Sequence, residues 1–135
     1  MKDTIGLHTP KTLSFAKRIV KRLPQAIRNG LPAEISVVPV SEKESRALNR
    51  QYRKKNAPAN VLSFFYSPEY GEIIVCPMLI RAEAKAQNNS FEYQFAWMIA
   101  HGMIHLAGLH HERSVVAAKK SEALEKNILR HFPKQ

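Results

Sequence analysis

The chain is poor in the features that mark secreted or membrane proteins. Only one of its 135 residues is a cysteine, Cys76, so no internal disulfide can form and a reducing, cytoplasmic location is expected. No apolar run approaches the roughly 18 residues that a membrane helix needs. The N-terminus lacks a basic segment followed by an apolar one, so we expect neither export nor a membrane partner.

Linkers, internal repeats and low-complexity stretches are missing as well. With 44% hydrophobic residues, a chain of this length can bury a sizeable single core. We therefore expect residues 1–135 to form one domain.

Acidic residues are scarce relative to basic ones. The chain has 11 Asp and Glu against 21 Lys and Arg, which gives a formal net charge of +10. Such a small basic protein attracts polyanions, although solvated lysine faces are common and charge alone does not establish a nucleic-acid partner. The basic residues are densest in two groups: Arg46, Arg50, Arg53, Lys54 and Lys55, and then Lys17, Arg18, Lys21, Arg22 and Arg28.

The hydrophobic pattern alternates between helical and extended periods. Helical spacing, caps and a capping box at Ser41–Glu44 predict helices at residues 9–29, 41–52, 77–87, 91–106 and 114–130. Apolar β-rich runs predict strands at residues 33–40, 61–66 and 72–76, the last two joined as a hairpin. Helices flanking a small sheet indicate an α+β or layered α/β fold.

Histidines gather in the stretch His101-Gly-Met-Ile-His105-Leu-Ala-Gly108-Leu-His-His111. His101 and His105 lie one helical turn apart, with Cβ atoms about 6 Å from each other, so both rings can reach one zinc ion. Gly108 can adopt the left-handed conformation that ends a helix and turns the chain back. That turn would bring in His111, or alternatively His110, as a third ligand. Three protein nitrogens leave a fourth position open, which is typical of catalytic zinc.

The same histidine spacing also occurs in zinc peptidases of the metzincin type. Those enzymes carry a general-base Glu after the first histidine, where this chain has Gly102, and a Met-turn downstream, whereas no Met follows His111. A third hypothesis is a non-catalytic RNA-binding ribosome assembly factor in which zinc only holds the fold.

The histidine stretch resembles the signature of the YbeY endoribonucleases, which reads His-Gly-x-Leu-His-Leu-x-Gly-x-Asp-His. Four further blocks resemble segments of that family in the same order: Leu48-Asn49, Tyr52-Arg53, Val61-Leu62-Ser63-Phe64 and Gly71-Glu72-Ile73-Ile74-Val75-Cys76. Several motifs in the right order are more specific than the histidines alone.

The resemblance implies a zinc-dependent, single-strand-specific endoribonuclease that matures ribosomal RNA at the 3′ end of the small-subunit RNA and acts in ribosome quality control. Its expected partners are ribosomal RNA precursors and the small ribosomal subunit. The implied fold is zincin-like: a mixed sheet of about three to four strands packed with helices, and a metal site on a central helix and the following loop.

The resemblance also implies roles for individual residues. The zinc ligands carry over onto His101, His105 and His111, and the family's functional arginine carries over onto Arg53. The planar fork of Arg53 would hold the scissile phosphate and stabilise its developing charge. Arg50, Lys54 and Lys55 are expected to bind the RNA backbone.

Some positions depart from the family pattern. Asn60 and His110 stand where the family usually has aspartates, and Phe65 replaces a proline. Loss of carboxylates that orient ligand imidazoles typically lowers metal affinity or activity 10–100-fold. The base that activates water is not defined, because Glu112 and His110 are candidates only by proximity.

Overall fold

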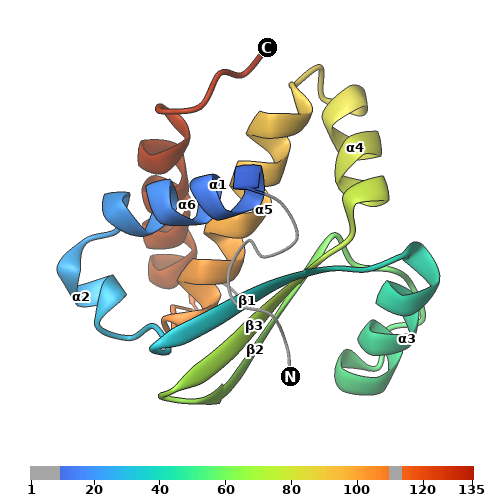
Figure 1. Ribbon diagram of the computed structural model, residues 1–135, viewed down its shortest axis with the longest axis horizontal. Coiled ribbons are helices and arrows are strands. Elements are labelled where there is room, and N and C mark those ends of the chain that lie inside the picture. Colours follow the sequence, from blue (N-terminus) through green and yellow to red (C-terminus); the bar gives the residue numbers. More distant parts are fainter. Residues whose placement is uncertain (1–9, 110–113) are drawn as a thin grey trace.

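The computed structural model describes residues 10–109 and 114–135. Its helices and strands are mixed along the chain, and three helices follow the last described strand (Figure 1). The elements are α1 (Pro10–Arg22), α2 (Gln25–Arg28), β1 (Glu34–Pro39), α3 (Glu42–Arg53), β2 (Val61–Ser67), β3 (Tyr70–Val75), α4 (Pro77–Ala86), α5 (Phe91–Leu106) and α6 (Val115–Leu129). The predicted α+β fold class is confirmed.

The described strands form a mixed three-stranded sheet in the order β1-β3-β2. β1 runs parallel to β3, with Val37 opposite Ile73, and β2 runs antiparallel to β3, with Ser63 opposite the same residue. The predicted hairpin is confirmed, but its strands extend further than expected, to Ser67 and from Tyr70. Within the described sheet, β2 is an edge strand.

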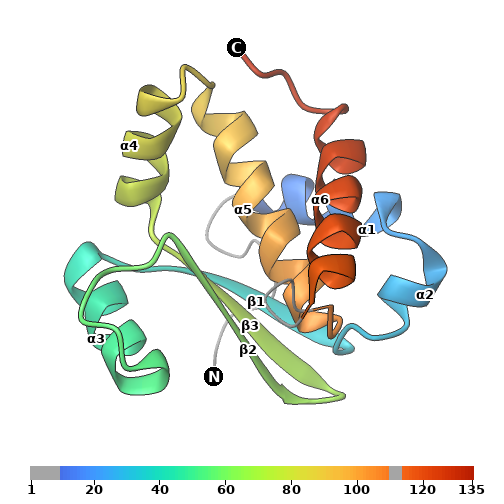
Figure 2. The ribbon, with the colours of Figure 1, turned by 180° about the vertical axis from the view of Figure 1, so that it is seen from behind.

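Helices lie on both sides of the sheet. Figures 1 and 2 show α1, α5 and α6 on one side and α3 on the other. Adjacent residues of β2 contact helices on opposite sides of the sheet, because successive side chains of a strand point in opposite directions. Ser63 Oγ donates a hydrogen bond to the Gly102 carbonyl oxygen of α5 (3.0 Å), whereas the Phe64 ring contacts Tyr52 of α3, with ring centroids 5.1 Å apart. The sheet therefore separates α3 from α5.

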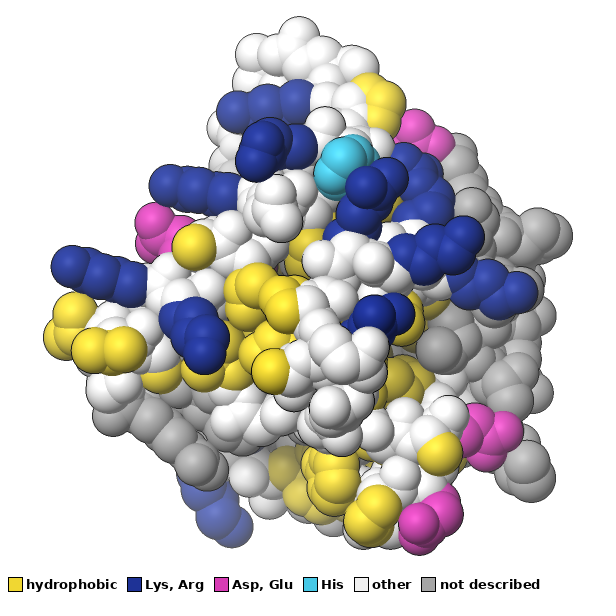
Figure 3. Space-filling view, turned by 90° about the vertical axis from the view of Figure 1, so that its left-hand side faces the viewer, with side chains coloured by type: hydrophobic (Ala, Val, Ile, Leu, Met, Phe, Trp, Pro, Cys, Tyr) yellow, Lys and Arg dark blue, Asp and Glu magenta, His cyan; other side chains and the backbone are white. Residues whose placement is uncertain are grey.

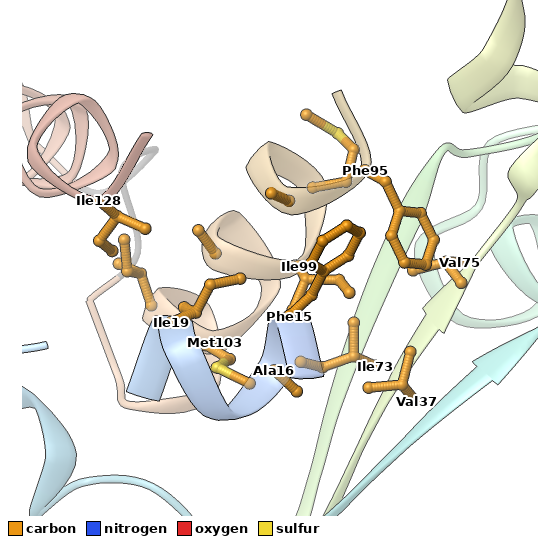
Figure 4. Close-up of a cluster of buried hydrophobic side chains, with 14 of the residues drawn as sticks. Phe15, Ala16, Ile19, Val37, Ile73, Val75, Phe95, Ile99, Met103 and Ile128 are labelled. Atoms are coloured by element: carbon orange, nitrogen blue, oxygen red, sulfur yellow. The ribbon is translucent and has the colours of Figure 1, made fainter. Parts of the chain in front are cut away.

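The hydrophobic core fills the space between α1, the sheet, α5 and α6. Figure 4 shows side chains of α1, the sheet and α6 packed together with those of α5. Fully buried members include Ile19, Ile73, Ile99, Met103 and Ile128. Because α5 contacts the sheet, α1, α4 and α6, its position is determined from several directions.

Serine caps fix where the long helices begin. Ser41 Oγ accepts from the Glu44 amide (3.1 Å) while the Ser41 amide donates to the Glu44 carboxylate (3.0 Å), so the predicted capping box is confirmed. Ser90 caps α5 by accepting from the Tyr93 amide (3.0 Å), and Ser114 caps α6.

The prediction of one continuous helix over residues 9–29 was wrong. Within the described part of this segment, α1 ends at Arg22 and a separate short helix, α2, begins at Gln25. Pro24 explains the break: it has no amide hydrogen to donate, and it disfavours the helical conformation of Leu23 before it.

Cys76 is completely buried at the junction of β3 and α4, as expected for a small core residue. No helix in the described ranges combines the length and the apolar character needed to cross a bilayer.

We predict that Gly102→Ala destabilises the protein. A Cβ at this position would lie 2.9 Å from Ile73 Cγ2 and 3.1 Å from Ser63 Oγ, closer than normal packing allows. Overpacking of this kind typically destabilises a protein by about 1–3 kcal/mol, and the better helix propensity of alanine offsets at most about 1 kcal/mol of that. Urea denaturation measures the change, and an unchanged or higher unfolding free energy would contradict the close contact between α5 and the sheet.

Candidate metal centre

His101 and His105 project from adjacent turns near the C-terminal end of α5. Their ring centroids lie 4.7 Å apart and their planes are inclined by 39°. Both side chains are partly exposed, while their neighbours Gly102, Met103 and Ile104 are buried. The buried neighbours hold the helix against the sheet and α1, and the two imidazoles lie together outside the core.

Gly108 ends the helix as predicted. It has φ +98°, and its amide donates to the His105 carbonyl oxygen (2.9 Å) while the Leu109 amide donates to the Ile104 carbonyl oxygen (3.2 Å). These two hydrogen bonds define a Schellman motif, which satisfies the last carbonyls of the helix and turns the chain.

The third predicted ligand, His111, lies outside the described residues, as do the alternatives His110 and Glu112. Among residues 10–109 and 114–135, no three His, Cys, Asp or Glu side chains come together to hold an ion. The structure thus brings together two of the predicted ligands, and the three-histidine site stays a prediction.

A buried glutamate on α6, Glu125, is hydrogen-bonded to His101. His101 Nδ1 donates to Oε2 of Glu125 (2.7 Å), and this oxygen also accepts from Ser121 Oγ (3.2 Å). The other carboxylate oxygen accepts from Trp97 Nε1 (2.9 Å). Burial raises the pKa of the Glu125 carboxyl, but the hydrogen bonds from His101, Trp97 and Ser121 outweigh burial and hold the pKa below its usual range.

This carboxylate fixes both the orientation and the tautomer of the His101 ring. With Nδ1 engaged by Glu125, coordination of a metal by His101 would use Nε2. A carboxylate behind a ligand imidazole is the usual arrangement in zinc proteins, where it orients the ring and raises its basicity. The imidazoles of His101 and His105, with the Glu125 carboxylate behind the first, therefore suit zinc.

The sequence analysis did not identify Glu125. It lies 24 residues from His101, and only the packing of α6 on α5 joins them. A weak signal was present, because Ser121 and Glu125 are polar residues one turn apart on the same helix face as Ile128, which is completely buried.

Solvent reaches the histidines through two depressions. His101 borders a groove of about 450 Å³ between α5 and α6, which Trp97 and Glu125 also line. His105 borders a second depression of about 470 Å³, next to Ser63 and Phe65 of β2. A polymeric substrate could therefore approach the histidines from either side.

Position 102 has no room for the catalytic carboxylate of a metzincin. Gly102 is buried, and a Cβ there would already press on Ile73 and Ser63. A glutamate at this position could not be accommodated without moving α5 away from the sheet. Packing therefore gives a physical reason, independent of the sequence pattern, against the peptidase alternative.

The predicted RNA-binding residues lie apart from the histidines. Arg50 and Arg53 are exposed on the last turn of α3, and Lys54 and Lys55 follow them, with Lys54 in the left-handed conformation that ends the helix (φ 60°). Because the sheet separates α3 from α5, the described contacts do not place Arg53 beside either histidine. Its predicted catalytic role stays a prediction.

The second basic group is spread over another surface. Figure 3 shows Lys and Arg side chains distributed across the face that carries α1, α2 and α6. One of these residues, Arg18, is fixed there: its guanidinium donates to the His131 carbonyl oxygen (2.7 Å) and lies 4.1 Å from the centre of the Phe132 ring.

Asn60, which replaces a family aspartate, has a structural partner. Its side-chain amide nitrogen donates to both carboxylate oxygens of Glu83 on α4 (2.9 and 3.1 Å). Its main-chain carbonyl oxygen accepts from the Cys76 amide (2.9 Å). An aspartate here would place two carboxylates together, whereas the amide joins the start of β2 to α4. The described hydrogen bonds of Asn60 are thus to α4 and to Cys76, which caps it, rather than to the histidines.

The chain is similar to proteins of a known family. The family model described as Endoribonuclease YbeY matches residues 2–133. An Endoribonuclease YbeY of Thermotoga petrophila is 44% identical over 105 residues, covering 76% of this chain and 70% of that protein. One from Pseudoalteromonas translucida is 39% identical over 104 residues, covering 72% and 68%.

A solved structure is similar as well. The solution structure of TM1509 from Thermotoga maritima aligns with a TM-score of 0.57 at 25% identity, covering 88% of this chain and 84% of that one. The chain belongs to the Endoribonuclease YbeY family. The resemblance seen in its sequence motifs is confirmed.

We predict that Glu125→Gln weakens zinc binding by about 10–100-fold, because the neutral amide no longer orients and polarises the His101 ring. Competition with a chromophoric chelator measures the affinity. Glu122→Gln is the matched control, since Glu122 lies on the same helix with its side chain 70% exposed and paired to Lys126. Equal affinities for both variants would show that Glu125 does not support the metal.

Proposed function

We propose that this protein is a zinc-dependent endoribonuclease that cleaves single-stranded RNA during maturation of the small-subunit ribosomal RNA. The observation that carries the proposal is the His101 imidazole, held by the buried carboxylate of Glu125 beside His105, in a chain of the Endoribonuclease YbeY family. The excess of basic residues supports a polyanionic substrate.

The residues present fit a zinc ion. His101 and His105, together with His111 beyond the described residues, would hold it, and all three offer the imidazole nitrogens that zinc accepts. When bound, zinc supplies a Lewis acid for a phosphoryl oxygen and lowers the pKa of water. Three imidazoles would also accept nickel, copper or iron, so the choice of zinc is part of the proposal.

The protein's own groups then position the metal ligands and the RNA. Glu125 keeps the His101 ring in one tautomer, and the depressions beside His101 and His105 admit an extended strand. Arg50, Arg53, Lys54 and Lys55 would bind phosphates on the far side of β2. Because β2 is an edge of the described sheet, one RNA strand could pass over it and contact both the basic end of α3 and the histidines.

The wider setting is also part of the proposal. The expected substrate is a ribosomal RNA precursor, near its 3′ end in the small subunit, and the expected compartment is the cytoplasm, which suits a protein with one buried cysteine. The competing view, an assembly factor in which zinc only supports folding, differs in one measurable respect: its RNA would remain intact.

We expect cleavage, but not RNA binding, to depend on the metal centre. Protein purified without a histidine tag should cut single-stranded RNA, and both chelation and His105→Ala should reduce the rate at least 100-fold. Anisotropy should show RNA affinity within about threefold of wild type, because phosphate contacts supply most of the affinity. Full cleavage after complete metal removal would rule out this function, and turnover of casein instead would favour the peptidase.

The basic end of α3 generates a separate prediction. Arg53→Ala should weaken RNA binding for all sequences alike and lower the slope of log affinity against log salt by about 1, because one phosphate contact is lost. Lys43→Ala, an exposed change at the start of the same helix, is the control. An unchanged salt slope with a large fall in kcat would instead assign Arg53 to the chemical step.

A further inference from the structure

Phe65 has an unusual position for a phenylalanine. Its side chain is 52% exposed on the edge strand β2. It lines the same depression as His105, together with Ser63 and the backbone that follows α5. An apolar ring is thus exposed in the same depression as a predicted metal ligand.

The neighbouring aromatic residues of β2 have structural partners, and Phe65 differs from them. Phe64 contacts Tyr52 on the other side of the sheet, and the Tyr66 ring stacks on Tyr70, with centroids 5.8 Å apart. The Tyr66 hydroxyl also donates to a Glu72 carboxylate oxygen (2.9 Å). Among the described residues, Phe65 has no aromatic contact, and about half of its side chain is exposed.

Main chain and side chains together line the depression. Gly30 and Ala107, which also line it, approach so closely that a Cβ on Gly30 would lie 2.5 Å from the Ala107 carbonyl oxygen. Main chain therefore contributes to the lining there, and Gly108 lines the depression as well. The depression has an aromatic ring and an imidazole among its walls and a volume of about 470 Å³.

We propose that Phe65 is the stacking platform for one unpaired nucleobase of the RNA substrate, at a nucleotide that flanks the phosphate cleaved beside His105. This inference rests on the proposed function. Every base has a π-face that can stack on a phenyl ring, and stacking requires a base that is not already covered by duplex neighbours. A net charge of +10 favours a nucleic-acid strand over an apolar peptide as the occupant. The platform would thus contribute to a preference for single strands without selecting a sequence.

A double-mutant cycle between protein and RNA tests the contact. Short single-stranded RNAs with one abasic nucleotide, moved along the strand in turn, are assayed with wild type, Phe65→Ala and Phe65→Trp. We expect the wild type to lose roughly tenfold in kcat/KM, and in affinity measured with chelator present, at one flanking position. Phe65→Ala should show that loss with intact RNA and no further loss at the same abasic position, whereas Phe65→Trp should behave like wild type.

Tyr66→Ala is the matched control, because Tyr66 is adjacent in the strand and 60% exposed but contacts the opposite side of the sheet. It should leave the abasic profile unchanged, with thermal unfolding used to verify that all variants are folded. Losses that simply add at every position, or an equal effect from Tyr66→Ala, would overturn the platform while leaving the nuclease intact. A wild type that neither binds nor cleaves RNA would overturn the proposed function and this inference with it.

Discussion

The contact between α5 and the sheet at Gly102 determines where the histidines lie. At this position the helix backbone approaches Ile73 and Ser63 so closely that no side chain fits between them. The rotation of α5 about its axis is therefore fixed, and His101 comes to face Glu125 on α6 while His105 borders the depression next to β2. A larger residue at this position would press against Ile73 and Ser63.

The carboxylate of Glu125 depends on this packing in turn. Burying an ionised carboxylate is unfavourable unless it is hydrogen-bonded, and here three donors from His101, Trp97 and Ser121 satisfy it. Two of the donors belong to α5 and one to α6, so the polar contact also joins the helices. The orientation of the His101 ring and the packing of α6 on α5 are consequently coupled through one group.

Local chemistry made much of the structure predictable. The capping box at Ser41, the helix bearing the histidines and the turn at Gly108 all depend on residues within a few positions of one another, and all are confirmed. Helical periodicity over residues 9–29 outweighed the break at Pro24 in the sequence analysis, and there the prediction failed.

Contacts between distant segments were not predictable in this way. Glu125 reaches His101 only because α6 packs on α5. A single sequence does not indicate which residues of two helices will be in contact. Arg53 shares a motif block with Tyr52, yet the sheet separates their helix from the histidines. Phe65 stood out in the sequence only as a departure from the family pattern, and its place beside His105 required the fold.

The most direct measurement is a crystal structure of the zinc-loaded protein, with the ion located by anomalous scattering. We expect three imidazole nitrogens on the metal, from His101, His105 and His111, with His101 bound through Nε2 while its Nδ1 still donates to Glu125. Zinc bound by the Glu125 carboxylate itself, or a site that excludes His101, would contradict the arrangement on which the proposed chemistry depends.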